Sequence, residues 1–275
     1  MKNHKNHPRE LKNIGDFVTV DNNGYLVKTV SLYSLQEELR PLIRECTSII
    51  LSIIGSNTHS IYIRGSVAKG TFLAGISDLD VFIVSREIIN SDLLKKVAKS
   101  FYEINEGWKS VVGIEFSYMS ASKLVKTKSP IYKYQTVCVY GDDLTPLMPS
   151  LRPGVDTTVH LLKIIDRVQE SYPKVEEMTS QEEIKSFSIW IAKSLIRSSH
   201  ELVAQDLRRF ARDIYPCLEG ASHFYPEQRE LLRRTALVAI FGTTDKKALL
   251  EIMHEMQDFI EPKITLFLKI TRATI

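Results

Sequence analysis

Two aspartates one residue apart are the residues of this chain best suited to do chemistry. Asp78 and Asp80 open an apolar segment, residues 79–84, that has the character of a β-strand. Residues i and i+2 of a strand point to the same face, roughly 6.6 Å apart along its axis, so both carboxylates can share one small volume. Leu79 and Val81 then point away into packing. Two anions held this close repel each other unless a cation compensates them, and a divalent metal ion is the natural partner.

A third carboxylate could complete this site. Glu115 lies within VVGIEFSY, residues 111–118, where apolar side chains alternate on one face and Glu115 shares the other face with Gly113 and Ser117. A carboxylate in so apolar a strand is costly unless it meets a cation. If this strand pairs with the 79–84 strand, Glu115 joins the aspartates in a three-carboxylate cluster. If the strand is an edge with a wet outer face, Glu115 is simply solvated.

A Gly-Ser turn precedes the aspartate pair. Gly65 and Gly70 match the outer glycines of a P-loop, but Thr71 and Phe72 stand where that motif requires Lys and then Ser or Thr. The P-loop interpretation therefore fails. A glycine still lets the backbone approach a phosphate closely, and Ser66 can donate a hydrogen bond at the start of a helix. The turn gains weight because it comes one short helix before the paired aspartates.

The elements that must position these residues change in character along the chain. The first half alternates helices with strands, and residues 17–30 read as a hairpin around Asn23-Gly24. Its strands are expected at 61–64, 79–84, 111–118 and 134–140, and its helices at 32–54 and 91–104. After about residue 154 the pattern is helical, at 156–171, 181–204, 206–215, 226–241 and 245–269, with Pro216, Gly220 and Gly242 at breaks.

This change predicts the fold class and the domains. We expect an α/β (α+β) N-terminal domain with a small mixed sheet over residues 1–150, its core at about 30–145. An all-α helical bundle is expected over residues 151–275.

Taken together, Gly65-Ser66, Asp78-Leu79-Asp80 and Glu115 resemble the signature of the DNA polymerase beta-like nucleotidyltransferase superfamily. The resemblance covers about residues 60–120. More loosely, the whole layout is similar to aminoglycoside-type nucleotidyltransferases, in which a helical C-terminal domain contributes to the substrate cleft.

The resemblance implies a metal-assisted reaction. Asp78 and Asp80 would hold two Mg²⁺ ions, with Mn²⁺ as an alternative, and Glu115 would complete the catalytic metal site. A hydroxyl of the acceptor attacks the α-phosphorus of an NTP, with ATP expected, and pyrophosphate leaves. Gly65 and Ser66 would contact the β- or γ-phosphate. Glu115 could also accept the proton of the hydroxyl.

Basic residues are candidates for binding the nucleotide phosphates. Lys69 lies beside the Gly-Ser turn, and Lys193 and Arg197 are four residues apart on a predicted helix, so they share one face. The alternative is a solvated basic face. Further arginines make the C-terminal half locally basic and either line a cleft for an RNA acceptor or are solvated; these are Arg208, Arg209, Arg212, Arg229, Arg233 and Arg234.

Composition bounds the class of protein. The net charge of +3 over 275 residues is below that expected of a dedicated nucleic-acid binder. No apolar run is long enough to span a bilayer, so no membrane association is expected. Cys46, Cys138 and Cys217 suggest neither a disulfide framework nor a zinc site, which favours a reducing cytoplasm.

The sequence therefore predicts an enzyme that transfers NMP to a hydroxyl of a small molecule such as an aminoglycoside-like compound. One alternative keeps this chemistry but uses tRNA, another RNA or a protein side chain as the acceptor. Another is a non-catalytic, nucleotide-binding regulatory module, against which the intact Asp78, Asp80 and Gly65-Ser66 speak. The acceptor and the oligomeric state are left open.

Overall fold

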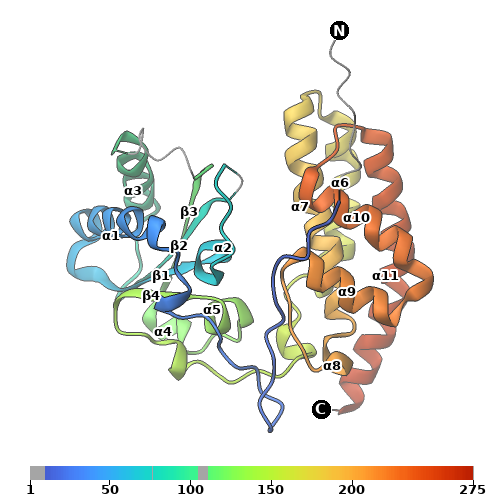
Figure 1. The fold of residues 1–275 in the computed structure, drawn as a ribbon, viewed down its shortest axis with the longest axis horizontal. Helices are drawn as coiled ribbons and strands as arrows, with labels where there is room; N and C mark the ends of the chain where they lie inside the picture. The colour runs from blue at the N-terminus through green and yellow to red at the C-terminus, as the bar shows by residue number, and fades with distance from the viewer. Residues whose placement is uncertain (1–9, 76, 105–110, 275) are drawn as a thin grey trace. The chain divides into compact units, whose positions relative to one another are not determined.

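The structure is a computed structural model that describes residues 10–75, 77–104 and 111–274. It divides into two compact units (Figure 1): one spans Leu26–Leu151, and the other joins the chain up to Tyr25 to the chain from Arg152 onward. The predicted N-terminal domain covers residues 1–150, whereas the described residues before Leu26 belong to the helical unit. The physical reason is local, because Val18 exchanges backbone hydrogen bonds of 2.7 and 3.0 Å with Phe210.

The first unit contains a four-stranded mixed sheet with the strand order β3-β2-β1-β4. Strand β2 pairs antiparallel with β1 and parallel with β3, while β4 pairs antiparallel with β1. The predicted α/β fold with a small mixed sheet is confirmed. The strands are β1 (Thr58–Arg64), β2 (Leu79–Ser85), β3 (Ile114–Ser120) and β4 (Val137–Gly141).

Alternating side chains place two different cores on the two faces of the sheet. Helices α1 (Arg40–Ile54) and α3 (Ser91–Ile104) cover one face (Figure 1), where Ile63 and Val81 are buried with the apolar side chains of both helices. On the other face Tyr62 and Phe82 pack with Leu124. This second face carries the even-numbered residues of β1 and β2, so Arg64 and Asp80 belong to it. Helices α4 (Ala121–Leu124) and α5 (Pro130–Tyr134) contribute to the core of this second face, whereas α2 (Gly65–Lys69) packs in the core of the first.

Strand β3 is held in register by the helix-covered face. The rings of Phe116 on β3 and Phe101 on α3 meet edge to face, with their centroids 6.3 Å apart. Phe116 is the register partner of Val81 in the parallel pairing. The odd-numbered residues of β3 therefore point to the opposite face, in step with the even-numbered residues of β2.

The second unit is helical, and its described elements surround one apolar core. Its helices are α6 (Ile164–Glu177), α7 (Gln181–Glu201), α8 (Ala204–Leu207), α9 (Ile214–Phe224), α10 (Arg229–Phe241) and α11 (Lys246–Thr274), with a 3₁₀ turn at Leu161–Lys163. No helix within the described ranges is both long and apolar enough to cross a bilayer.

Two helix predictions in this unit are wrong. The predicted helix at 206–215 is absent, since α8 ends at Leu207, and α9 fills a stretch where the sequence suggested breaks. Pro216 lies in the first turn of α9, where its missing N–H has no intrahelical partner to lose. Gly220 is needed for close packing, because a Cβ there would lie 2.7 Å from Nδ1 of His200 on α7.

The predicted hairpin at residues 17–30 forms only next to its turn. Its turn forms, with the Asp21 N–H donating to the Tyr25 carbonyl at 2.8 Å, but the pairing does not extend along the two arms. Val18 pairs with Phe210, while the N–H of Leu26 donates to the carbonyl of Leu151. Both Val18 and Leu26 are buried at these positions, so their partners elsewhere offer more burial than an isolated two-stranded hairpin.

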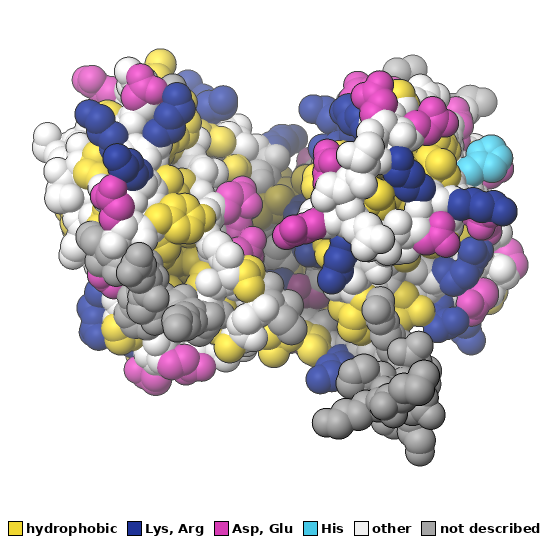
Figure 2. Space-filling model, turned by 90° about the horizontal axis from the view of Figure 1, so that it is seen from above, with side chains coloured by type: hydrophobic (Ala, Val, Ile, Leu, Met, Phe, Trp, Pro, Cys, Tyr) yellow, Lys and Arg dark blue, Asp and Glu magenta, His cyan; other side chains and the backbone are white. Residues whose placement is uncertain are grey.

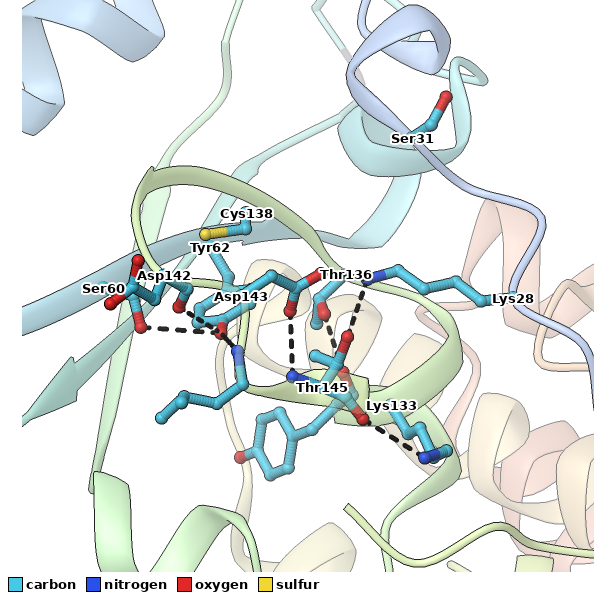
Figure 3. A network of polar contacts seen from close by, with 12 residues as sticks. Lys28, Ser31, Ser60, Tyr62, Lys133, Thr136, Cys138, Asp142, Asp143 and Thr145 are labelled. Carbon is cyan, nitrogen blue, oxygen red and sulfur yellow. Dashed lines mark hydrogen bonds and ion pairs between the residues drawn. The ribbon is translucent and has the colours of Figure 1, made fainter. Parts of the chain in front are cut away.

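The acidic pair Asp142-Asp143 has a structural role. Asp143 accepts a hydrogen bond from the N–H of Thr145 at 2.9 Å and forms an ion pair of 3.2 Å with Lys28 (Figure 3). The hydroxyl of Tyr62 donates to the carbonyl of Asp142 and accepts from the N–H of Leu144. This network fixes the segment that follows β4.

Candidate active site

Three carboxylates converge at one end of β2. One oxygen from each of Asp78, Asp80 and Glu115 lies within 4.8 Å of the others. Asp80 and Glu115 are register partners in the parallel β2–β3 pairing, so their side chains stand side by side on the same face. This pairing is the condition on which the predicted grouping depended. The structure brings the three predicted residues together.

Gly65 makes room for this cluster. Its φ of +70° is one that L-residues rarely adopt, and a Cβ at this position would lie 2.1 Å from Oδ2 of Asp80. The chain turns here from β1 into α2, and Ser66 is the second residue of that helix. The Gly-Ser turn and the aspartate pair thus meet in space, although eleven residues lie between Ser66 and Asp78.

Arg64 is a residue of this site that the sequence analysis missed. It lies opposite Asp80 in the antiparallel β1–β2 pairing, and its Nη2 is 3.0 Å from Oδ1 of Asp80 and 2.5 Å from Oε1 of Glu115. The guanidinium therefore bridges two strands. A cation at the end of an otherwise apolar strand, directly before Gly-Ser, is the signal that could have drawn attention to it.

Burial and neighbouring charges shift the pKa of Asp80. Its side chain is 16% exposed. The pKa of Asp80 is raised to about 6, mainly by burial; the charge of Arg64 lowers it, and the charges of Asp78 and Glu115 add to the rise. An additional cation beside such a buried carboxylate would stabilise its charged form.

The chemistry of the cluster fits a divalent metal ion. Mg²⁺ and Mn²⁺ prefer carboxylate oxygens, and each of the three residues offers one oxygen toward a common volume. Glu115 is 60% exposed, which leaves an open side for substrate.

The predicted phosphate-binding cations lie in different places. Lys69 is the last residue of α2 and is half-buried near the Gly-Ser turn. Lys193 and Arg197 are half-buried on one face of α7 in the helical unit, and Nε of Arg197 donates to the carbonyl of Arg212 at 2.9 Å. Their part in nucleotide binding stays a prediction.

Several arginines of the helical unit have local acidic partners. Arg233 pairs with Glu230, and Arg234 pairs with Glu255. On the face seen in Figure 2, basic side chains of this unit are interspersed with acidic ones. Arg233 and Arg234 are thus better explained as exposed side chains in local ion pairs than as part of an RNA-binding surface.

The similarity of this sequence to known proteins agrees with the geometry of the site. The family model of the nucleotidyltransferase domain matches residues 43–136, which contain β1, β2 and β3 and so all three carboxylates. Residues 43–136 form a nucleotidyltransferase domain. This match supports a nucleotidyltransferase enzyme, as the sequence predicts. No curated protein matches the sequence.

One solved structure is similar in fold to this chain. It is spectinomycin adenyltransferase AAD(9) from Enterococcus faecialis, determined with ATP and spectinomycin. The match has a TM-score of 0.52 at 15% sequence identity and covers 80% of this chain and 98% of that chain. The predicted pairing of an α/β nucleotidyltransferase domain with a helical part is confirmed.

Proposed function

We propose that this nucleotidyltransferase transfers NMP from an NTP, with ATP as the favoured donor, to a hydroxyl of a small aminoglycoside-like molecule. The observation that carries the proposal is the in-register pair of Asp80 and Glu115, with Asp78 beside it. A carboxylate cluster next to a Gly-Ser turn offers what nucleotidyl transfer requires, namely a metal site adjoining a phosphate site.

The side chains take complementary roles in this proposal. Asp78, Asp80 and Glu115 would hold Mg²⁺, which when bound supplies positive charge for the triphosphate and for the leaving pyrophosphate. Gly65 and Ser66 would accept a phosphate close to the backbone, because Gly65 has no side chain to obstruct it.

Glu115 is suited to a second role. Its side chain is exposed, whereas that of Asp80 is largely buried, so Glu115 faces the open side of the cluster. As the acceptor oxygen bonds to the α-phosphorus and the bond to pyrophosphate breaks, Glu115 would take the proton of the hydroxyl. We assign Lys69, Lys193 and Arg197 to the phosphate groups.

Support for a small-molecule acceptor comes from the solved relative, whose structure contains ATP and spectinomycin. An RNA acceptor is less favoured, because Arg233 and Arg234 are engaged by acidic partners.

The test is transfer of label from α-³²P-labelled NTPs to a panel of aminoglycosides and aminocyclitols in the presence of Mg²⁺. Asp80→Asn should abolish transfer, and EDTA should do the same. Asp142→Asn is the matched control, since Asp142 is an exposed aspartate outside the cluster. Transfer that survives in Asp80→Asn would contradict the proposed site, whereas labelling of tRNA alone would redirect the acceptor to RNA.

A further inference from the structure

The position of Arg64 implies a role in addition to those assigned above. Arg64 ends β1 and its side chain is only 18% exposed. Its Nη2 contacts Oδ1 of Asp80 and Oε1 of Glu115 at the same time. The guanidinium thus makes ion pairs with oxygens of two of the three residues proposed to hold the metal.

A guanidinium and a divalent metal compete for these oxygens. Arginine stays protonated throughout the physiological pH range, so it cannot lose its charge to make room for a second cation. A metal ion coordinated by the same oxygens would meet both steric conflict and like-charge repulsion from Arg64. One of the two cations must therefore leave the shared oxygens.

The surroundings of Arg64 are consistent with a side chain that can exchange partners. Its Nε is buried and has no hydrogen-bond partner among the residues that the structure describes. Both ion pairs between Arg64 and the cluster are made by a single atom, Nη2. A paired bidentate fork would hold an arginine more firmly.

We propose that Arg64 is a resident counter-cation of the acidic cluster, which is exchanged for the divalent metal when the metal binds. This inference rests on the proposed function, because it takes Asp78, Asp80 and Glu115 as the metal ligands. Before metal binds, Arg64 stabilises Asp80 and Glu115 in adjacent positions. When metal binds, Arg64 gives up its contacts with their oxygens, which weakens the apparent affinity for metal.

The test is a Mn²⁺ titration without nucleotide, in which free Mn²⁺ is counted by electron paramagnetic resonance, alongside thermal unfolding with and without Mn²⁺. Removing the competing charge with Arg64→Met should tighten Mn²⁺ binding roughly tenfold. The same variant should melt at a lower temperature without metal, and Mn²⁺ should raise its melting temperature more than it raises that of the wild type. Arg86→Met, which removes an exposed arginine after β2, should leave Mn²⁺ binding unchanged.

The opposite results overturn the inference. Mn²⁺ binding by Arg64→Met that equals or is weaker than that of the wild type would mean that Arg64 only supports the site. If Arg64→Met does not fold, Arg64→Gln keeps most of the length and a donor without the charge, and the same tightening is expected.

Asp80→Asn separates this inference from the proposed function. If Asp80→Asn loses Mn²⁺ binding while Arg64→Met shows no tightening, only the counter-cation role fails. If Asp80→Asn binds Mn²⁺ as well as the wild type, or if neither the wild type nor Arg64→Met binds it, the proposed metal site fails together with the inference.

Discussion

Gly65 and Asp80 are in such close contact that no side chain fits at position 65. A Cβ atom at Gly65 would lie 2.1 Å from one carboxylate oxygen of Asp80 and 3.1 Å from its Cγ. The position of the Asp80 carboxylate therefore depends on a glycine at the turn.

Gly65→Ala should abolish nucleotidyl transfer. The new methyl group must displace the Asp80 carboxylate, and we expect a fall in kcat of roughly 100-fold or more, in line with misplacement of a catalytic group. Gly75→Ala is the matched control, because Gly75 has a φ of +73° but a Cβ there would meet nothing within 4 Å. Both variants should lose about 1 kcal/mol of unfolding free energy to backbone strain, measured by urea denaturation. Equal activity in the two variants would contradict the role given to the Gly65–Asp80 contact.

Glu115→Gln should separate chemistry from nucleotide binding. The amide keeps the shape of the side chain but cannot take a proton from the acceptor, so kcat should fall by roughly 100-fold or more. Binding of the NTP with Mg²⁺, measured by calorimetry, should change less than kcat because Asp78 and Asp80 are retained. Full activity in this variant would exclude Glu115 as a required member of the site.

Glu201 should be important for the stability of the helical unit. Its carboxylate is buried and accepts hydrogen bonds from the N–H groups of His160 and Leu161 at 2.9 and 2.8 Å. Glu201→Leu would leave these buried N–H groups without an acceptor, and we expect a loss of about 2 kcal/mol or more in unfolding free energy. Ser199→Ala, which removes a hydroxyl bonded within its own helix, should cost less than about 1 kcal/mol in the same urea titration. Equal losses in both variants would count against this account of Glu201.

Acid should destabilise the protein through His200. Burial lowers the pKa of His200 from its ordinary value near 6.5 to about 4, and neither ring nitrogen has a hydrogen-bond partner among the described residues. The unfolded chain therefore binds a proton that the folded chain does not, so stability is full above pH 6.5 and falls as the pH drops toward 4. This residue alone contributes a decline of up to about 1.4 kcal/mol per pH unit within that window.

His200→Leu tests this dependence. Urea titrations at several pH values between about 7 and 5 should give a shallower fall in unfolding free energy for the variant than for the wild type. Some slope should persist, because burial also lowers the pKa of His160. Identical slopes for the two proteins would contradict the prediction.

The sequence is informative about this site where the signal is local. Asp78, Asp80 and Gly65-Ser66 lie within one short stretch, so strand periodicity and turn chemistry suffice to single them out. Glu115 is more distant, and its place depended on which strands pair. Arg64 depended on the register of that pairing, which an apolar strand does not reveal by itself.

The errors have the same origin in long-range contacts. The segment around Val18 has the pattern of a hairpin arm, but it gains more from burial against Phe210, almost two hundred residues away. Pro216 and Gly220 suggest breaks in the sequence, but both lie within helix α9. Pro216 is tolerated because it lies in the first turn, and Gly220 is required because a Cβ at this position would clash with His200. Tertiary packing overrode local propensity at Val18 and at Gly220.

The edge-to-face contact of Phe101 with Phe116 has a consequence beyond packing. Because strand side chains alternate, a slip of β3 by one residue would turn Glu115 into the apolar layer beneath α1 and α3 and move Phe116 to the polar face. The apolar face of the sheet therefore fixes the register of the carboxylates on the opposite face. A substitution in this apolar layer that leaves the protein folded can still misalign the carboxylates, so loss of activity and loss of stability need not go together.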